Sequence, residues 1–72
     1  MKTNITTLEN SLTERETEVV NHLVLGKKDR EISEELHLSI STVKTHLRSI
    51  YKKLQVRNRT EASNVILEAR RN

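Results

Sequence analysis

Residues 38–55 read LSISTVKTHLRSIYKKLQ, and the periodicity of this stretch decides the fold. An α-helix turns by about 100° per residue, so apolar side chains three or four positions apart share one face. This stretch places four of them in one stripe: Val43, Leu47, Ile50 and Leu54. The opposite face is polar or basic: Ser41, Thr45, Arg48 and Lys52. We therefore predict an amphipathic helix over residues 40–55, capped by Ser39, with one buried face and one basic face.

A first helix is predicted to start at Thr13. Thr13 and Glu16 have the spacing of a capping box, in which the hydroxyl and the carboxylate each accept a backbone N–H. Gly26, the single glycine of the chain, is expected to end this helix in the left-handed conformation. The apolar stripe of the helix comprises Val19, Val20, Leu23 and Val24.

A second, shorter helix is expected from Asp29 or Arg30 to His37. Asp29 is the best N-cap residue available, because its carboxylate can accept backbone N–H groups of the first turn. Ile32 and Leu36, four positions apart, form its apolar pair. Followed by a brief turn and the basic helix, this segment gives residues 32–50 the layout of a helix-turn-helix.

A fourth helix is predicted from near Thr60 to Arg70. Its apolar stripe comprises Ala62, Val65, Ile66 and Ala69. Residues 1–10 are mostly polar and are predicted to form a flexible arm. Residues 11–72 are predicted to be one all-α, compact four-helix domain, because strand and hairpin patterns are absent and the loops are short.

Composition limits the class of protein. The 72 residues suffice for one small domain, and its core must be aliphatic because the chain has one Tyr and no Phe or Trp. Without Cys there is no disulfide and no thiolate metal site. No apolar stretch approaches the roughly 20 residues of a membrane span, and no signal peptide is recognisable. We expect a soluble, cytoplasmic protein without a membrane partner.

Basic charge is concentrated in one part of the chain. All ten acidic residues lie outside the segment between Leu36 and Thr60. That segment holds six cations: Lys44, Arg48, Lys52, Lys53, Arg57 and Arg59. Solvated helix faces usually mix both signs of charge, so this clustering, more than the net charge of +3, predicts a nucleic acid as partner.

The exposed face of the 40–55 helix has the geometry of a major-groove reader. Lys44, Thr45 and Arg48 lie within about one turn, so we expect them to contact neighbouring base pairs. Backbone N–H groups at Ser41 and Thr42 are expected to be unpaired at the helix start and to suit a phosphate. Three later cations are expected to reach phosphates: Lys52, Lys53 and Arg57.

An ordered series of motifs extends over about four fifths of the chain, from Leu12 to Ala69. It comprises Leu12-Thr13-Glu14-Arg15-Glu16, Gly26, Arg30-Glu31-Ile32-Ser33, Leu38-Ser39, Thr42-Val43-Lys44-Thr45-His46 and Asn58-Arg59-Thr60-Glu61-Ala62. In residues and spacing, this series resembles the LuxR-type helix-turn-helix family of DNA-binding domains, which includes the LuxR, NarL, FixJ and GerE regulators. The resemblance implies that the third helix enters the major groove and that Lys44, Thr45 and Arg48 face the bases. It also implies a homodimer through the fourth helix, with Ser63 and Leu67 at the interface.

Three residues depart from the family pattern. Lys28 stands where a Ser or Thr cap is common, so that cap either moves to Asp29 or is lost, at a cost of about 1 kcal/mol. Gln55 replaces a common Gly, and a left-handed conformation there would strain it by about 1 kcal/mol. Ser33 replaces the usual Ala, and its hydroxyl can bond back to a helix carbonyl.

Other chemical groups in the chain have simpler interpretations. The three histidines, His22, His37 and His46, lack metal-site spacing. Glu34 and Glu35 are adjacent and diverge by about 100° on a helix, so they cannot act as a catalytic pair. We expect no enzyme activity, no cofactor, no metal and no small-molecule ligand. Arg59 is expected to pair with Glu16, Glu18 or Glu31 in preference to a phosphate.

The function predicted is that of a sequence-specific, double-stranded DNA-binding transcriptional regulator that acts as a homodimer. RNA polymerase is a further candidate partner, and a location at the nucleoid is expected. Two alternatives stay open: a promoter reader like sigma-factor region four, and a protein-interaction module for an acidic partner. Whether the chain stands alone or is the effector half of a larger regulator is also open.

Overall fold

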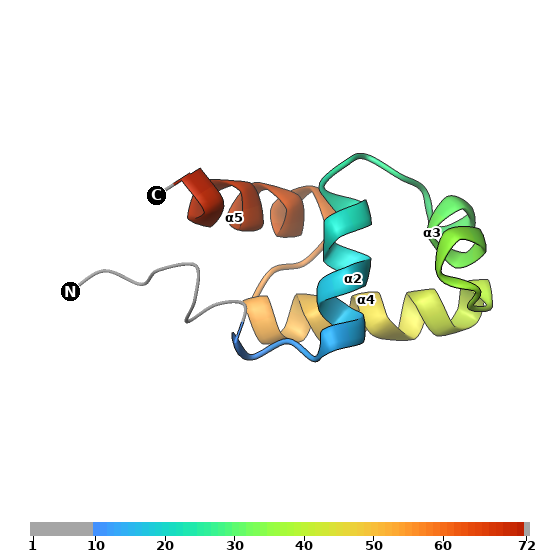
Figure 1. The fold of residues 1–72 in the computed structure, drawn as a ribbon. Helices are drawn as coiled ribbons and strands as arrows, with labels where there is room; N and C mark the ends of the chain where they lie inside the picture. The colour runs from blue at the N-terminus through green and yellow to red at the C-terminus, as the bar shows by residue number, and fades with distance from the viewer. Residues whose placement is uncertain (1–9, 72) are drawn as a thin grey trace.

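Four α-helices form the secondary structure of residues 10–71, the part of the chain that the computed structural model describes (Figure 1). They are α2 (Glu14–Leu23), α3 (Asp29–Leu36), α4 (Ile40–Leu54) and α5 (Arg59–Arg71). The predicted all-α class is confirmed, and each boundary lies within one or two residues of its expected place. The predicted flexible arm, residues 1–10, lies outside the described residues except for Asn10.

Helix α4 is the element against which the other three pack. Helices α2, α3 and α5 all contact it, and α2 also touches α3 and α5. In Figure 1, α2 crosses α4, and α3 lies by the N-terminal end of α4. Helix α5 lies on the side of α2 opposite to α3. This arrangement surrounds one face of α4 with helices and leaves its opposite face uncovered.

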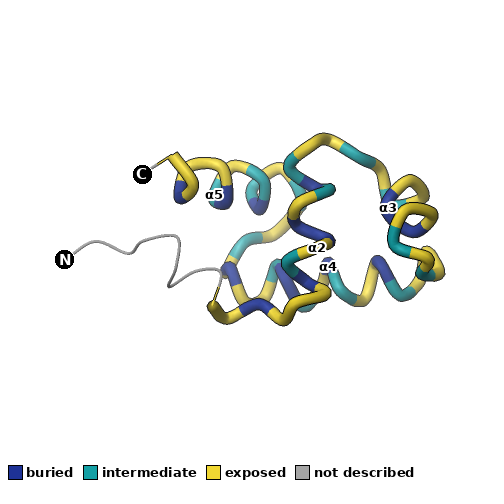
Figure 2. The backbone as a smooth tube through the Cα atoms, in the orientation of Figure 1, coloured by how far each residue is buried: buried dark blue, intermediate teal, exposed yellow. Residues whose placement is uncertain are grey.

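The core is aliphatic, as the composition predicts. All four residues of the expected α4 stripe are buried, and they meet the stripes of the other helices (Figure 2). The buried apolar set is Leu12, Val19, Val20, Leu23, Ile32, Val43, Leu47, Ile50, Leu54, Ala62, Ile66 and Ala69. Each fully buried Val, Leu or Ile contributes about 1.5–3 kcal/mol through removal of apolar surface from water, which offsets part of the chain entropy lost on folding.

Local side-chain caps define most helix starts. The capping box of α2 is confirmed, because Thr13 Oγ1 accepts the Glu16 N–H at 3.1 Å while Glu16 Oε1 accepts the Thr13 N–H at 2.9 Å. Ser39 caps α4 by accepting the Thr42 N–H at 3.1 Å. Asn58 caps α5 through Oδ1, which accepts the Glu61 N–H at 2.9 Å, so α5 begins earlier than expected.

The expected cap of α3 is wrong. Asp29 is the first helical residue, and the N-cap position belongs to Lys28, whose side chain makes no cap bond. Instead, the Glu31 carboxylate accepts the Lys28 N–H at 2.8 Å. The physical reason is that Asp29 has stronger partners elsewhere in the fold, described below. The side-chain cap before this helix is therefore lost. This is one of the two outcomes expected from the presence of Lys28 at the cap position.

A buried carboxylate fastens α2 to α4. The side chain of Glu16 is 5% exposed, and its oxygens accept hydrogen bonds from Lys53 Nζ at 2.7 Å and Ser49 Oγ at 2.6 Å. Burial alone would raise the pKa of Glu16. The hydrogen bonds from Lys53, Ser49 and the Thr13 backbone outweigh it and lower the pKa from 4.5 to about 2. Glu16 therefore serves both the cap of its own helix and the α2–α4 contact.

Three residues adopt left-handed backbone conformations at helix ends. Gly26, with φ +82°, follows α2 as predicted. His37 and Gln55, with φ 58° and 59°, end α3 and α4. A side chain at such a position costs about 1 kcal/mol because Cβ crowds the following carbonyl. The strain expected at Gln55 is thus present, and His37 carries the same strain without a sequence signal that announced it.

Replacing Glu16 with Gln, which resembles the protonated carboxyl, is expected to lower the free energy of unfolding by about 3 kcal/mol at pH 7. The native pKa lies below the unfolded one, so this stabilisation is complete above about pH 4.5 and disappears as the pH falls through about 2. Urea denaturation followed by circular dichroism at a series of pH values measures both effects.

The control for this substitution is Glu18→Gln. Glu18 lies on the same helix, and its exposed carboxylate pairs with Arg15 at 3.0 Å, so its replacement should change stability by less than about 1 kcal/mol. The wild type and Glu16→Gln should converge in stability between pH 4.5 and 2. Parallel loss of stability in the two proteins over that range would contradict the role given to Glu16.

Replacing Gln55 with Gly is expected to stabilise the protein by about 1 kcal/mol, because Gly adopts the left-handed conformation without steric cost. Thermal unfolding should shift upward by about 4–8 °C for a domain of this size. Lys52→Gly, at an exposed helical position of α4, is the matched control and should destabilise by about 1 kcal/mol. Equal destabilisation by both glycines would show that Gln55 is not strained.

Candidate nucleic-acid interface

The three residues predicted to contact bases lie together on the uncovered face of α4. Lys44, Thr45 and Arg48 are all exposed. The Thr45 hydroxyl donates to the Ser41 carbonyl at 3.0 Å, so its hydrogen-bonding capacity is partly used within the helix. Among residues 10–71, no carboxylate lies within ion-pair distance of Arg48. The Arg48 guanidinium therefore keeps its donors available to an external acceptor.

Serine and threonine hydroxyls gather at the start of α4. Ser39 Oγ lies 2.8 Å from Thr42 Oγ1 and 3.2 Å from Ser41 Oγ. The expectation of an unpaired backbone N–H at Thr42 is wrong, because this N–H donates to the Ser39 cap. The reason is position, since Thr42 is the third residue of the helix, where a Ser cap finds its donor. Phosphate contact by Ser41 and Thr42 side chains stays a prediction.

The later cations differ in how free their charge is. Lys52 is exposed on α4, and Arg57, after the helix, is 88% exposed beside Glu61 at 3.4 Å. Lys53 instead lies 2.7 Å from the buried Glu16 carboxylate, with one third of its side chain exposed. Lys53 thus has the least free charge of the three residues predicted to reach phosphates.

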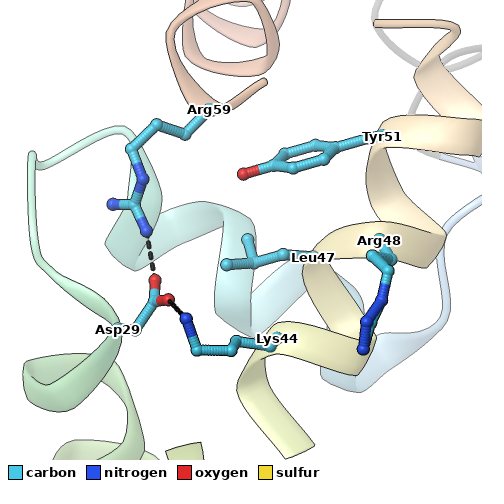
Figure 3. Close-up of a pocket in the computed structure, with 6 residues that line it drawn as sticks. All are labelled: Asp29, Lys44, Leu47, Arg48, Tyr51 and Arg59. Carbon is cyan, nitrogen blue, oxygen red and sulfur yellow. Dashed lines mark hydrogen bonds and ion pairs between the residues drawn. The ribbon is translucent and has the colours of Figure 1, made fainter. Parts of the chain in front are cut away.

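A hollow of about 320 Å³ lies beside the candidate base-reading residues. Its walls come from three helices: Asp29 of α3, Arg59 of α5, and Lys44, Leu47, Arg48 and Tyr51 of α4. Figure 3 shows Asp29 between Lys44 and Arg59, with the Tyr51 ring across the hollow from Arg59. Burial raises the pKa of the Tyr51 phenol, so this side chain remains neutral at physiological pH and acts as a wall and polar tip.

Asp29 and Arg59 join the starts of α3 and α5. Arg59 donates one N–H to Asp29 Oδ1 and another to the Lys27 carbonyl, the latter at 2.9 Å. The expectation that Arg59 forms a structural ion pair is correct in kind, but the partners expected for it, Glu16, Glu18 and Glu31, are wrong. Glu16 is taken by Lys53, Glu18 by Arg15, and Glu31 by the Lys28 backbone.

The residue of the candidate site that the sequence did not reveal is Asp29. Its second oxygen, Oδ2, lies 3.3 Å from Lys44 Nζ, so one carboxylate contacts two cations from two other helices (Figure 3). The partners stand 15 and 30 positions away in the sequence, beyond the range of any local pattern. Three other acids, Glu31, Glu34 and Glu35, lie between Asp29 and the acid-free segment, so the sequence did not single Asp29 out.

The two residues predicted to form a dimer contact lie on the outer side of α5. Leu67 is 44% exposed and is one of three exposed large apolar residues among residues 10–71, with Leu25 and Ile40. Ser63 lines a second hollow of about 220 Å³ with Leu23, Gly26, Arg59, Thr60 and Asn64. The two residues are one helical turn apart, and among residues 10–71 Leu67 is exposed and Ser63 is half-buried.

Residues 10–71 contain neither a candidate metal centre nor a candidate membrane-spanning helix. None of the His, Asp and Glu side chains in this range cluster in threes at a spacing suited to a metal ion. None of the helices in the same range has the length and apolar character that crossing a bilayer requires. His22 Nδ1 is buried without a hydrogen-bond partner, 3.3 Å from Glu35 Oε1. That carboxylate oxygen accepts a hydrogen bond from Lys27 Nζ at 2.6 Å.

Comparison with known proteins places this geometry in context. The family described as bacterial regulatory proteins, luxR family, matches residues 10–66. The CsgBAC operon transcriptional regulatory protein of Escherichia coli is 49% identical over 51 residues, which is 71% of this chain and 24% of that protein.

Two other relatives give the same picture. The transcriptional regulatory protein LiaR of Bacillus subtilis is 49% identical over 53 residues, covering 74% of this chain and 25% of that protein. The nitrate/nitrite response regulator protein NarP of Escherichia coli is 41% identical over 59 residues, covering 82% and 27%. The chain therefore spans about a quarter of the length of these curated relatives.

Proposed function

The chain belongs to the luxR family of bacterial regulatory proteins, and from this premise we propose that it binds double-stranded DNA sequence-specifically and regulates transcription. One observation carries the proposal: α4 presents an acid-free face with three exposed candidate readers, Lys44, Thr45 and Arg48, on a domain of modest size. A helix of this form fits the major groove of B-DNA. The protein would act by binding, in the cytoplasm at the chromosome, and would catalyse no reaction.

Roles within the proposed interface follow from side-chain chemistry. Arg48, with a planar guanidinium and no protein carboxylate to satisfy it among residues 10–71, suits bidentate recognition of guanine O6 and N7. Thr45, whose hydroxyl is directed to the Ser41 carbonyl, offers its methyl group to thymine. Lys44 would accompany them at a neighbouring base. Ser41, Thr42, Lys52 and Arg57 would contact phosphates, with Lys53 a weaker contributor because of its bond to Glu16.

We further propose that two copies bind together through α5, with Ser63 and Leu67 at the contact. The support is the exposed Leu67 side chain beside a small residue on a helix face that the domain does not cover. Two domains related by two-fold symmetry would present two α4 helices to half-sites about one DNA turn apart. RNA polymerase is the partner through which such a dimer would affect transcription.

The test of this function is selection of bound duplexes from a random-sequence pool by the purified chain, followed by sequencing. The proposal expects an enriched motif with two-fold symmetry. A motif without symmetry would remove the dimer and favour a monomeric promoter reader. Absence of binding to any duplex at low salt would remove DNA binding altogether and leave a module for an acidic protein partner.

Arg48→Ala and Lys52→Ala are expected to weaken DNA binding in different ways. Loss of the base contact by Arg48 should reduce discrimination between the selected duplex and random duplex by about 1–3 kcal/mol. Loss of a phosphate contact by Lys52 should weaken both complexes alike and lower the slope of log affinity against log salt by about 1. Fluorescence anisotropy titrations at several salt concentrations measure both quantities.

The two substitutions are matched controls for each other, because each removes one exposed cation from the same helix. Circular dichroism spectra should show that both variants fold. Equal losses on selected and random duplex for Arg48→Ala would remove Arg48 from the base-reading set.

A further inference from the structure

The Asp29 carboxylate occupies an unusual place beside the proposed base-reading face. The segment between Leu36 and Thr60 has no acid, yet the fold places the Asp29 carboxylate, from the start of α3, beside its residue Lys44. Asp29 Oδ2 lies 3.3 Å from Lys44 Nζ, and Asp29 is the single acidic residue that lines the hollow beside α4 (Figure 3). A negative charge is unexpected beside the proposed DNA-binding surface, because it repels the phosphates of DNA.

The carboxylate is held in place independently of Lys44. Arg59 binds its other oxygen, Oδ1, and the same guanidinium donates to the Lys27 carbonyl at 2.9 Å. The Asp29 side chain is 21% exposed, whereas the Lys44 side chain is 59% exposed. Asp29 is thus the member of the pair that a second partner holds, and Lys44 is the more exposed member that it restrains.

This restraint has opposite effects on two kinds of complex. Random DNA attracts Lys44 through phosphates, which are acceptors available at every register, and a fixed carboxylate competes with each of them. A specific site offers an acceptor at one defined base edge, where a lysine already held near its bound position loses less rotamer freedom. The charge of Asp29 therefore weakens the attraction of Lys44 to random DNA more than its contact with a base at the specific site.

We propose that Asp29 is a specificity-determining positioning residue, which restrains Lys44 and so lowers binding to random DNA relative to the cognate site. This inference rests on the proposed function. Asp29 acts here through Lys44 and does not itself contact a base. Arg48 is joined to the carboxylate by no ion pair or hydrogen bond in Figure 3, so the effect passes through Lys44.

The variant that tests this role is Asp29→Asn, which keeps the shape of the side chain and removes its charge. Dissociation constants are measured on the duplex selected by the wild type and on a random duplex, at two salt concentrations. Affinity for the random duplex should rise about threefold to tenfold, while affinity for the selected duplex changes less than about threefold. The ratio of the two affinities should fall about fivefold.

The matched control is Glu35→Gln, which makes the same change in net charge. Glu35 pairs with Lys27 at 2.6 Å and with His22, away from the hollow, so the ratio should remain within about twofold of the wild type. In a Lys44→Ala background, Asp29→Asn should no longer change the ratio. This loss of effect separates action through Lys44 from a general structural role.

A second substitution covers the case in which Asp29→Asn fails to fold because Arg59 loses its ion pair. Asp29→Glu retains the charge and the pairing with Arg59 but moves the carboxylate by one methylene relative to Lys44. It should keep affinity for random duplex near the wild-type value and lower affinity for the selected duplex. Thermal unfolding confirms the folded state of each variant.

Failure of the proposed DNA binding and failure of the role of Asp29 give different results. Wild-type protein that binds no duplex would overturn both. Wild-type protein that selects a motif, with Asp29→Asn raising both affinities equally or Asp29→Glu behaving as the wild type, would overturn the role of Asp29 alone. An unchanged effect of Asp29→Asn in the Lys44→Ala background would also overturn it.

Discussion

The fold depends on one apolar stripe, the four side chains that α4 buries: Val43, Leu47, Ile50 and Leu54. A chain with a single aromatic residue has few large side chains from which to build a core, so every helix must use the same central surface. Helices α2, α3 and α5 each reach α4, and this requirement sets their positions. The uncovered face of α4 is a consequence of the same geometry, because a helix buried along one stripe keeps its other side in water.

Polar contacts then fix what the apolar stripe leaves adjustable. Glu16 connects α2 to α4 through Lys53 and Ser49, and Asp29 connects α3 to α5 through Arg59. Both carboxylates take cations from the region that otherwise has no acid. As a result, the positive surface is smaller than the sequence suggests. Lys44, Arg48, Lys52 and Arg57 stay exposed, but Lys44 lies beside Asp29 and Arg57 beside Glu61. Two basic residues of the domain, Lys53 and Arg59, thus stabilise contacts between helices.

Local sequence predicted the elements well because helices and their caps are decided within a few residues. The spacing of apolar residues predicted the buried stripe of α4. The cap residues Thr13 and Ser39 predicted the starts of two helices. Contacts between distant residues were not predictable in this way. The pairing of Arg59 with Asp29 depends on the angle at which α5 meets α3, and the choice among several nearby acids follows from packing alone. His37 shows a further limit, since its left-handed backbone results from how α3 must turn into α4.

The position of Tyr51 has a practical consequence. It is the sole aromatic residue of the chain, and its ring lines the hollow between Asp29, Lys44 and Arg59 (Figure 3). In a protein without tryptophan, intrinsic ultraviolet emission comes from this one phenol. The molecule therefore carries an optical probe at the junction of three helices, and changes in emission intensity or anisotropy report on that junction without any added label.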